Sequence, residues 1–492
     1  MKKIILSIIL SAVFLIIFAA CKKDFLDTPD PNTTSSADFY KTDADFTAAI
    51  NATYGSLQRG SLFGREIYPV IDLVTDEIEA TPKSDANAQV PIDNFTTFPN
   101  NDLVTHVWND FYIVIFRANL VLDNIKGTPL QNRIKGEALF IRSLAYYYLT
   151  SLYGDVPLIL TSDAKKNISP TREKMNVIFD QLEKDLLQAK DLLPINYSPA
   201  ETGRATSGAV NGLLGIIYML EKKYDKAEPV FANIISSGTY DLVPNFRDNG
   251  NSLNENNKES LFEVQFSDQT GGNANWCEYC GDEGSFYQAY YGSAIFGDFW
   301  NFKPSVWILN QFEPNDPRKM ASIFGQGSLS NNGKPYSKSI DSVAVRKYVQ
   351  DTPEKYFAVD PINIRVLRFS DILLLYAEAL NENGKTAQAA VPINRVRTRA
   401  TADKTILPDV SSALSQGDMF NAIVHERIVE LCFEQKRWID LVRWDRAGKI
   451  NMIDVLNTNI NKAAKASVKN KLFPIPQGER DTNPLLVQNP GY

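Results

Sequence analysis

The chain has 492 residues, of which 44 % are hydrophobic and 22 % are charged, and its formal net charge is −7. This hydrophobic content is that of an ordinary globular chain, which excludes disorder as the default state. The acidic balance leaves no electrostatic footprint for nucleic acid, so a generic nucleic-acid binder is also excluded.

The first residues have the pattern of an export signal. Lys2 and Lys3 form a short positive region, an apolar run from Ile4 to Ala20 follows, and Cys21 comes next. Small residues before a cysteine suit a peptidase that cuts at that cysteine. Acyl chains on Cys21 would then anchor the protein to a membrane by burying methylene groups. The alternative is an uncleaved transmembrane helix, but this run is shorter than the roughly 20 apolar residues of a usual span.

We therefore expect three parts along the chain. Residues 1–20 are predicted to be a lipoprotein signal peptide. Residues 21–36 are predicted to be a lipidated tether, because Thr28 to Ser36 is rich in Pro, Asn, Thr and Ser. Residues 37–492 are predicted to form one mostly helical domain, with a loop-rich insertion at about residues 238–364.

Helical periodicity dominates the predicted domain. Apolar residues at spacings of three and four predict helices at Ala37–Gln58, Leu103–Ile125, Ile134–Tyr153, Lys174–Leu193, Ser207–Lys222, Asp225–Ser236, Ser370–Asn383, Thr386–Ala400, Gly417–Glu434 and Arg437–Ala447. Between Gly238 and Ile364 the composition shifts to Gly, Asn, Pro and aromatic residues, with a strand-like piece at Leu261–Phe266. Long loops of this kind often carry function.

Two segments have the spacing of tetratricopeptide-like helix pairs. The residues in the first are Leu214, Gly215, Tyr218, Ala227 and Phe231, and those in the second are Tyr376, Ala377, Leu380, Ala389 and Ile393. A small residue at Gly215 would let its helix approach the partner helix, while Tyr218 and Phe231 fill the seam. Such pairs would stack as an interaction scaffold. The alternative is two unrelated helical hairpins.

Signatures of catalysis are missing from the sequence. Its two histidines, His106 and His425, are more simply structural, and there is no Walker loop, no His-Glu-x-x-His and no Gly-x-Ser-x-Gly. We therefore expect no catalytic residue, no metal site and no cofactor. A glycoside hydrolase would need paired carboxylates, but no pair stands out.

Charged residues near the C-terminus suggest ion pairs instead. Glu426, Glu430 and Glu434 recur every four residues and predict a salt-bridged helix face, beside Arg427, Lys436 and Arg437. Glu378 is expected to be partly buried, with Arg395 or Arg399 as its structural partner.

Aromatic residues are concentrated in one loop segment. Residues 276–307 contain eleven of them in a chain that is 11 % aromatic overall. Exposed Trp and Tyr rings offer flat apolar faces with polar edges, on which the C–H faces of sugars stack. We predict Trp307 and Phe302 to be buried. The predicted ligand-binding residues are Trp276, Tyr279, Tyr287, Tyr290, Tyr291 and Trp300. The alternative is that half or more of these rings only pack the loop onto the scaffold.

Three cysteines remain after Cys21. Cys277 and Cys280 form a Cys-x-x-Cys pair, for which zinc would need a second ligand pair that is missing. A local disulfide is the preferred interpretation in an exported protein, with free thiols as the alternative. Cys432 is expected to be a small buried hydrophobic residue.

Ordered motifs along the full length resemble the SusD/RagB family of surface nutrient-binding lipoproteins from Bacteroidota. They are Phe25-Leu26-Asp27, Phe116-Arg117-Ala118-Asn119, Gly136-Glu137-Ala138-Leu139-Phe140-Ile141-Arg142, Tyr153-Gly154-Asp155-Val156-Pro157-Leu158, Gly203-Arg204-Ala205-Thr206, Asp316-Pro317-Arg318, Ile393-Asn394-Arg395-Val396-Arg397, Glu434-Gln435-Lys436-Arg437-Trp438-Ile439-Asp440-Leu441 and Leu472-Phe473-Pro474-Ile475-Pro476. Each motif is weak alone, and their order makes the resemblance specific. They are scaffold motifs, so they carry over no ligand-binding residue.

The resemblance implies a right-handed superhelix of tetratricopeptide-like helix pairs that supports an irregular ligand-binding region. It also implies a location on the outer membrane and a partner, a SusC-like TonB-dependent transporter over which the lipoprotein sits as a lid. The leading hypothesis is the capture of oligosaccharides for that transporter. The alternatives are a peptide binder on the same scaffold, a surface glycan hydrolase, and a scaffold that only gates the transporter.

Overall fold

The computed structural model describes residues 39–267, 285–292, 299–325, 328, 343–349, 360–460 and 462–492. The predicted signal peptide, the tether and Cys21 lie outside these residues. The chain divides into two compact units, Met1–Ala48 and Ala49–Tyr492. In the first unit, helix α3 (Asp43–Gly55) begins after Thr42, whose hydroxyl accepts from the backbone N–H of Asp45 at 3.3 Å while Asp45 Oδ2 accepts from the backbone N–H of Thr42 at 2.6 Å. This reciprocal pair fixes the start of the helix.

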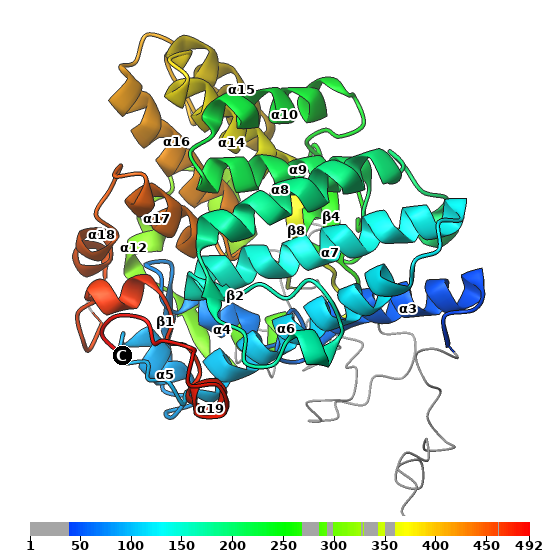
Figure 1. Cartoon of the computed structure of the whole chain (residues 1–492). Helices are drawn as coiled ribbons and strands as arrows, with labels where there is room; N and C mark the ends of the chain where they lie inside the picture. The colour runs from blue at the N-terminus through cyan, green and yellow to red at the C-terminus, as the bar shows by residue number, and fades with distance from the viewer. Residues whose placement is uncertain are drawn as a thin grey trace, which may run out of the picture. The chain divides into compact units, whose positions relative to one another are not determined.

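The second unit is mostly helical, and its long helices follow one another as packed neighbours (Figure 1). Helix α10 contacts α14, so the stack continues across the long insertion that separates them in sequence. The arrangement is that of tetratricopeptide-like helix pairs, as the sequence predicted. The helices are α6 (Asp102–Asn124), α7 (Pro129–Tyr153), α8 (Met175–Leu192), α9 (Ser207–Leu220), α10 (Tyr224–Ser236), α14 (Phe369–Glu382), α15 (Thr386–Ala400), α16 (Gln416–Leu431) and α17 (Arg437–Arg446).

Capping residues explain where several of these helices begin. The side chains of Thr128 and Thr206 accept from backbone N–H groups in the first turns of α7 and α9, and Pro129 follows Thr128 at a position where its missing N–H is not needed. Ser415 caps α16 in the same way. The predicted starts of α9 and α16 lie within one residue of the structure, whereas α7 begins at Pro129, five residues before the predicted Ile134.

The first predicted repeat is confirmed in its packing. Ala227 and Phe231 are buried in α10, and a Cβ atom added at Gly215 would collide with the ring of Phe231. The glycine therefore admits this ring into the seam between α9 and α10. In the second repeat Ala377, Leu380, Ala389 and Ile393 are likewise buried between α14 and α15.

The remaining elements are short. The helices are α4 (Ile67–Asp72), α5 (Gln89–Asp93), α11 (Tyr287–Tyr291), α12 (Val306–Leu309), α13 (Pro317–Ser322), α18 (Met452–Asn459) and α19 (Gln477–Thr482). The strands form antiparallel two-stranded pairs, which are β1 (Ile78–Ala80) with β5 (Phe302–Pro304), β2 (Val156–Pro157) with β3 (Arg172–Glu173), β4 (Ser260–Val264) with β8 (Ile364–Arg368), and β6 (Ile323–Phe324) with β7 (Ala344–Val345). The β4–β8 pair brings together two segments about a hundred residues apart.

Glu426 and Glu430 of α16, and Glu434 just after it, are ion-paired. These glutamates are buried, and their partners differ from the prediction. Glu430 contacts Arg368 at 2.7 Å, Arg318 at 3.3 Å and Arg399, and Glu434 contacts Lys347 at 2.6 Å. Burial raises the pKa of Glu430, but the arginines outweigh it and hold that pKa well below its usual range. The partners come from α13, β8, α15 and the turn after β7, and a local charge pattern does not encode contacts of such sequence separation.

The residues predicted to flank those glutamates pair elsewhere. Arg427 contacts Asp371 and Asp440, and Arg437 contacts Asp76. The predicted partners of Glu378 were also wrong. Its carboxylate accepts from Arg443 Nη2 at 2.7 Å and from Trp444 Nε1 at 3.0 Å, while Arg395 pairs with Asp241 and Arg399 with Glu259.

No helix among the described residues combines the length and the apolar character that crossing a bilayer requires. Cys432 is buried, as the sequence predicted, and it is a free thiol.

Candidate functional site

The aromatic segment is described in two pieces, residues 285–292 and 299–325. Of its predicted ligand-binding residues, Tyr287, Tyr290, Tyr291 and Trp300 lie in these pieces. Trp276 and Tyr279, and the predicted disulfide pair Cys277 and Cys280, lie outside the described residues.

Tyr287 and Tyr291 are fully buried and offer no ring face to a ligand in this structure. They lie four residues apart on α11, so they share one face of the helix, and their rings stack at a centroid distance of 4.4 Å. The Tyr287 hydroxyl donates to the Phe433 carbonyl at 2.7 Å, and the Tyr291 hydroxyl donates to Asp72 Oδ2 at 2.5 Å. Both rings anchor α11 to the scaffold.

Tyr290 and Trp300 are partly exposed and remain as candidates for a binding face. The Tyr290 ring packs against Phe302 at a centroid distance of 5.1 Å. The Trp300 ring packs against a small buried cluster of Phe324, Ala344 and Val349. Phe302 is buried, as predicted, whereas Trp307 is only partly buried, with Arg437 over its ring.

Trp300 is held in place through its backbone. Its φ angle is +52°, a left-handed conformation that is strained for a bulky residue, at a cost of about 1–3 kcal/mol. The backbone N–H donates to the Ala289 carbonyl, and the carbonyl accepts from Thr81 Oγ1 at 2.7 Å. Within the described part of the chain the buried indole N–H has no acceptor. A ring kept in place despite strain and an unpaired donor is typical of a functional position.

Strand β1 and the turn after it support Trp300. Strands β1 and β5 pair from Ile78 to Ala80, and the pairing continues as the Thr81 N–H donates to the Asn301 carbonyl at 2.8 Å. The Asn301 side chain donates in turn to the Lys83 carbonyl at 3.0 Å. Residues 81–84 therefore clamp the backbone on both sides of the Trp300–Asn301 peptide bond.

A buried acidic group lies beneath the aromatic segment. Burial raises the pKa of Asp72 to about 6, although the hydrogen bonds from Tyr291 and Gln435 lower it. Burial also raises the pKa of Glu77, which accepts from the Phe433 N–H at 3.0 Å. Both side chains are almost fully buried, so this group connects α4 to the start of α17 and cannot serve as an acid or base for a solvent-borne substrate.

The histidines also have structural partners. His106 Nδ1 lies 3.0 Å from Glu66, and His425 Nε2 lies 3.3 Å from Glu313. Burial raises the pKa of Glu313, but the hydrogen bonds from His425 and Arg397 lower it to about 2. The described residues contain no group of three or more His, Cys, Asp or Glu side chains placed to hold a metal ion.

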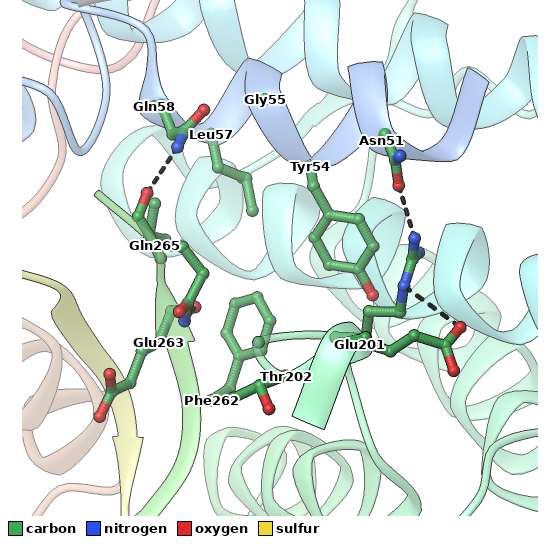
Figure 2. A pocket seen from close by; sticks show the side chains of 14 residues that line it. Asn51, Tyr54, Gly55, Leu57, Gln58, Glu201, Thr202, Phe262, Glu263 and Gln265 are labelled. Carbon is green, nitrogen blue, oxygen red and sulfur yellow. Dashed lines mark hydrogen bonds and ion pairs between the residues drawn. The ribbon is translucent and has the colours of Figure 1, made fainter. Parts of the chain in front are cut away.

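Two adjoining cavities lie on either side of the turn that leads into α9. The first, about 280 Å³, is lined by residues of α3, of the turn and of β4 (Figure 2). The second is about 270 Å³. Both are lined by Thr202, Gly203, Arg204, Phe262 and Glu263, so these residues form the wall between them.

Family models match almost the entire chain. One described as "SusD family" matches residues 227–492, and one described as "Starch-binding associating with outer membrane" matches residues 24–219. The first alone covers more than half of the chain. The chain belongs to the SusD family.

Curated relatives have the same family name and nearly the same length. SusD-like protein P2 of Formosa agariphila is 28 % identical over 483 residues, which cover 92 % of this chain and 94 % of the relative. A SusD-like protein of Bacteroides ovatus is 26 % identical over 526 residues, with coverage of 97 % and 90 %.

Solved structures of SusD-family proteins have a similar fold. A SusD superfamily protein from Bacteroides vulgatus gives a TM-score of 0.77 at 26 % identity, over 92 % of this chain and 100 % of the other. A structure named "Laminarin binding SusD-like protein" gives a TM-score of 0.76 at 26 % identity with the same coverage.

The cavities beside the α9 turn were not predicted from the sequence of this SusD-family chain. Gly203, Arg204 and Thr206 belong to a motif that was assigned to the scaffold. The sequence signal at this place is Gly203 itself. In the structure it has a φ of +94°, and a Cβ atom there would lie 2.7 Å from Gln265. A glycine next to an arginine in a turn suggests such a close approach, but it does not reveal an adjacent cavity.

Proposed function

We propose that this SusD-family protein captures oligosaccharides at the cell surface and passes them to a SusC-like TonB-dependent transporter. Membership of the family supports this proposal, as does the likeness over 92 % of the chain to a protein named as laminarin-binding. The relatives and solved structures described above carry no enzyme names, which favours binding without catalysis.

The main support for the proposal is the fixed, partly exposed ring of Trp300. Its partly exposed ring is fixed by the β1–β5 pair, by Thr81 and by the cluster beneath it. A ring held in advance loses little conformational entropy on binding, and its apolar face complements the C–H face of a sugar. Tyr290 lies in the other described piece of the aromatic segment, residues 285–292, and would extend this face. Trp276 and Tyr279 remain proposed contributors on the basis of composition alone.

A lipid on Cys21 would hold the protein on the outer membrane, facing the exterior. The signal pattern before Cys21 and the words "associating with outer membrane" in the matching family model support this placement. A tether raises the local concentration of a binding site near a transporter mouth without changing its affinity. Residues 1–20 are proposed to be removed and residues 21–36 to act as the spacer.

Calorimetric titration with a panel of neutral oligosaccharides and a panel of peptides tests the proposal. We expect at least one oligosaccharide to bind, and Trp300→Ala to weaken that binding about tenfold or more, since an aromatic contact with a ligand is often worth at least 1.4 kcal/mol. Phe116→Ala is the matched control, because Phe116 is 48 % exposed on α6, outside the aromatic segment. Binding of peptides alone would contradict an oligosaccharide ligand and support a peptide ligand. New reducing ends on the bound sugar would indicate a hydrolase.

A further inference from the structure

The first of the two cavities beside the α9 turn has an apolar floor with polar edges. In Figure 2, the side chains of Tyr54, Leu57 and Phe262 face the space from above and below. Asn51, which accepts a hydrogen bond from Arg204, lies at one edge, and Gln58 and Gln265 lie at the other. Pockets for small ligands have this make-up, with an apolar surface and a few polar groups that set orientation.

Hydrogen bonds fix these side chains before any ligand arrives. The Tyr54 hydroxyl accepts from the Ala205 N–H at 2.9 Å, and the Arg204 guanidinium lies 5.8 Å from the centre of the Tyr54 ring. Arg204 donates to Glu137 at 2.8 Å and to Asn51 Oδ1 at 2.6 Å. Because Glu137 is fully buried, it acts as a rigid anchor for Arg204. A preorganised wall of this kind lowers the entropic cost of binding.

The charged residues that line the first cavity are already paired. Arg204 contacts Glu137 at 2.8 Å, and Glu201 contacts Arg133 at 2.8 Å. Glu263, in the wall between the cavities, lies 3.3 Å from Arg365. Every charged side chain among the described residues that line the first cavity has an ion-pair partner, so this lining favours a neutral ligand.

Several polar atoms of the lining are still available. Within the described residues, Asn51 uses only its Oδ1 atom and Gln58 only its Nε2 atom, which donates to the Gln265 carbonyl at 2.5 Å. Their Nδ2 and Oε1 atoms offer one donor and one acceptor. In the second cavity, the Tyr197 hydroxyl is buried with no partner in the described part of the chain. An unpaired buried hydroxyl costs about 1–3 kcal/mol unless a ligand or water completes it.

We propose that the two cavities form a second saccharide-binding site, which takes neighbouring units of one neutral oligosaccharide across the Gly203–Arg204 wall. An apolar sugar face would lie against Tyr54 and Phe262, and hydroxyl groups would pair with Asn51, Gln58 and Tyr197. The combined space is comparable to that of small-molecule sites, about 300–1,000 Å³. The ligand class rests on the proposed function, whereas the location rests on this geometry alone.

Titration of the purified protein with laminarihexaose, maltohexaose and xylohexaose tests this site. We expect Gln58→Ala, Asn51→Ala and Tyr197→Phe each to weaken binding of a bound hexasaccharide about fivefold, the effect of one neutral hydrogen bond. Tyr197→Phe removes only an unpaired hydroxyl, so its thermal midpoint should be unchanged or higher, which separates a ligand contact from a structural role. Gln188→Ala is the matched control, because Gln188 is an exposed amide on α8 that lines neither cavity.

Hydrogen–deuterium exchange locates the bound sugar. We expect a saturating hexasaccharide to slow exchange in residues 200–206 as well as around Trp300. If Trp300→Ala weakens binding while the three cavity variants bind normally and residues 200–206 are not protected, the second site is refuted and the proposed function stands. If the unmodified protein binds none of the three sugars, both the second site and its ligand class are refuted for neutral hexasaccharides.

Discussion

Many charged side chains lie in the core of this protein, and the burial of such a group makes the stability of the fold depend on pH. Asp72 is 1 % exposed and accepts hydrogen bonds from Tyr291 and Gln435. Burial raises its pKa from 3.8 to about 6. The folded state therefore holds a proton on Asp72 at pH values where the unfolded chain has released it. Between about pH 4 and pH 6 this group makes the free energy of unfolding fall as the pH rises, and above pH 6 the penalty is complete.

Asp72→Asn tests this linkage because the amide stays neutral at every pH. Relative to the unmodified protein, the variant should gain about 2 kcal/mol in unfolding free energy on going from pH 4.5 to pH 7.5. Urea denaturation at the two pH values measures the difference. Asp191→Asn, at an exposed position near the end of α8, is the control. Equal pH slopes for Asp72→Asn and the unmodified protein would contradict the prediction.

Glu378 provides a second test at this scale. Its carboxylate contacts Arg443 and Trp444 in a fully buried setting, so Glu378→Gln leaves Arg443 with Asp440 as its remaining carboxylate. Breaking a buried pair costs about 3–5 kcal/mol, while an exposed pair contributes about 0–1 kcal/mol. We expect a large fall in the denaturation midpoint for Glu378→Gln. Lys404→Met, which removes the exposed Lys404–Asp409 pair, should change the midpoint little.

At the scale of elements, the helix pairs were predictable and the contacts between distant elements were not. The predicted Thr386–Ala400 helix has the observed bounds, because apolar periodicity is a local property. The partners of Glu430 come from segments up to 112 residues away, and no local pattern encodes them. For the aromatic segment, composition predicted a binding face, which stays a prediction. Burial of Tyr287 and Tyr291 depended on α11, whose four-residue spacing was a signal that composition alone does not use.

The α9–α10 seam allows a direct test of one element contact. Alanine normally favours a helix over glycine by about 1 kcal/mol, but a Cβ atom at residue 215 collides with Phe231. Gly215→Ala should therefore lower the free energy of unfolding by about 1–3 kcal/mol. Gly417→Ala in α16 is the control, because a Cβ atom there meets nothing closer than 4.0 Å. Phe231→Leu should lessen the effect of Gly215→Ala in a double-mutant cycle, and additive effects would contradict the contact.

At the scale of the whole molecule, the proposed function separates anchoring from binding. A lipid on Cys21 is proposed to hold the protein at the membrane, and Trp300 and the cavities beside α9 are proposed to contact sugar. The two roles lie in different parts of the sequence and use different chemistry, so each can be removed alone.

Cys21→Ala removes the proposed acylation site. We expect the variant to leave the membrane fraction and to keep its oligosaccharide affinity, because the tether changes local concentration and not the site. Cell fractionation with immunoblotting, followed by calorimetry on the released protein, measures both. Trp300→Ala is the converse control, since it should stay in the membrane fraction with reduced binding. A Cys21→Ala protein that remains membrane-bound would support an uncleaved helix.

The β4–β8 pair has an evolutionary consequence. It joins two segments about a hundred residues apart, so the ends of the chain between β4 and β8 are fixed to each other and to α9. Once loop ends are held, each doubling of loop length adds only about 0.6 kcal/mol of closure entropy. Mutation can therefore lengthen or shorten the loops between the buried anchors, such as α11, Arg318 and Lys347, at little cost in closure entropy. The β4–β8 pair would let related proteins evolve to bind new sugars while they keep the same helix stack.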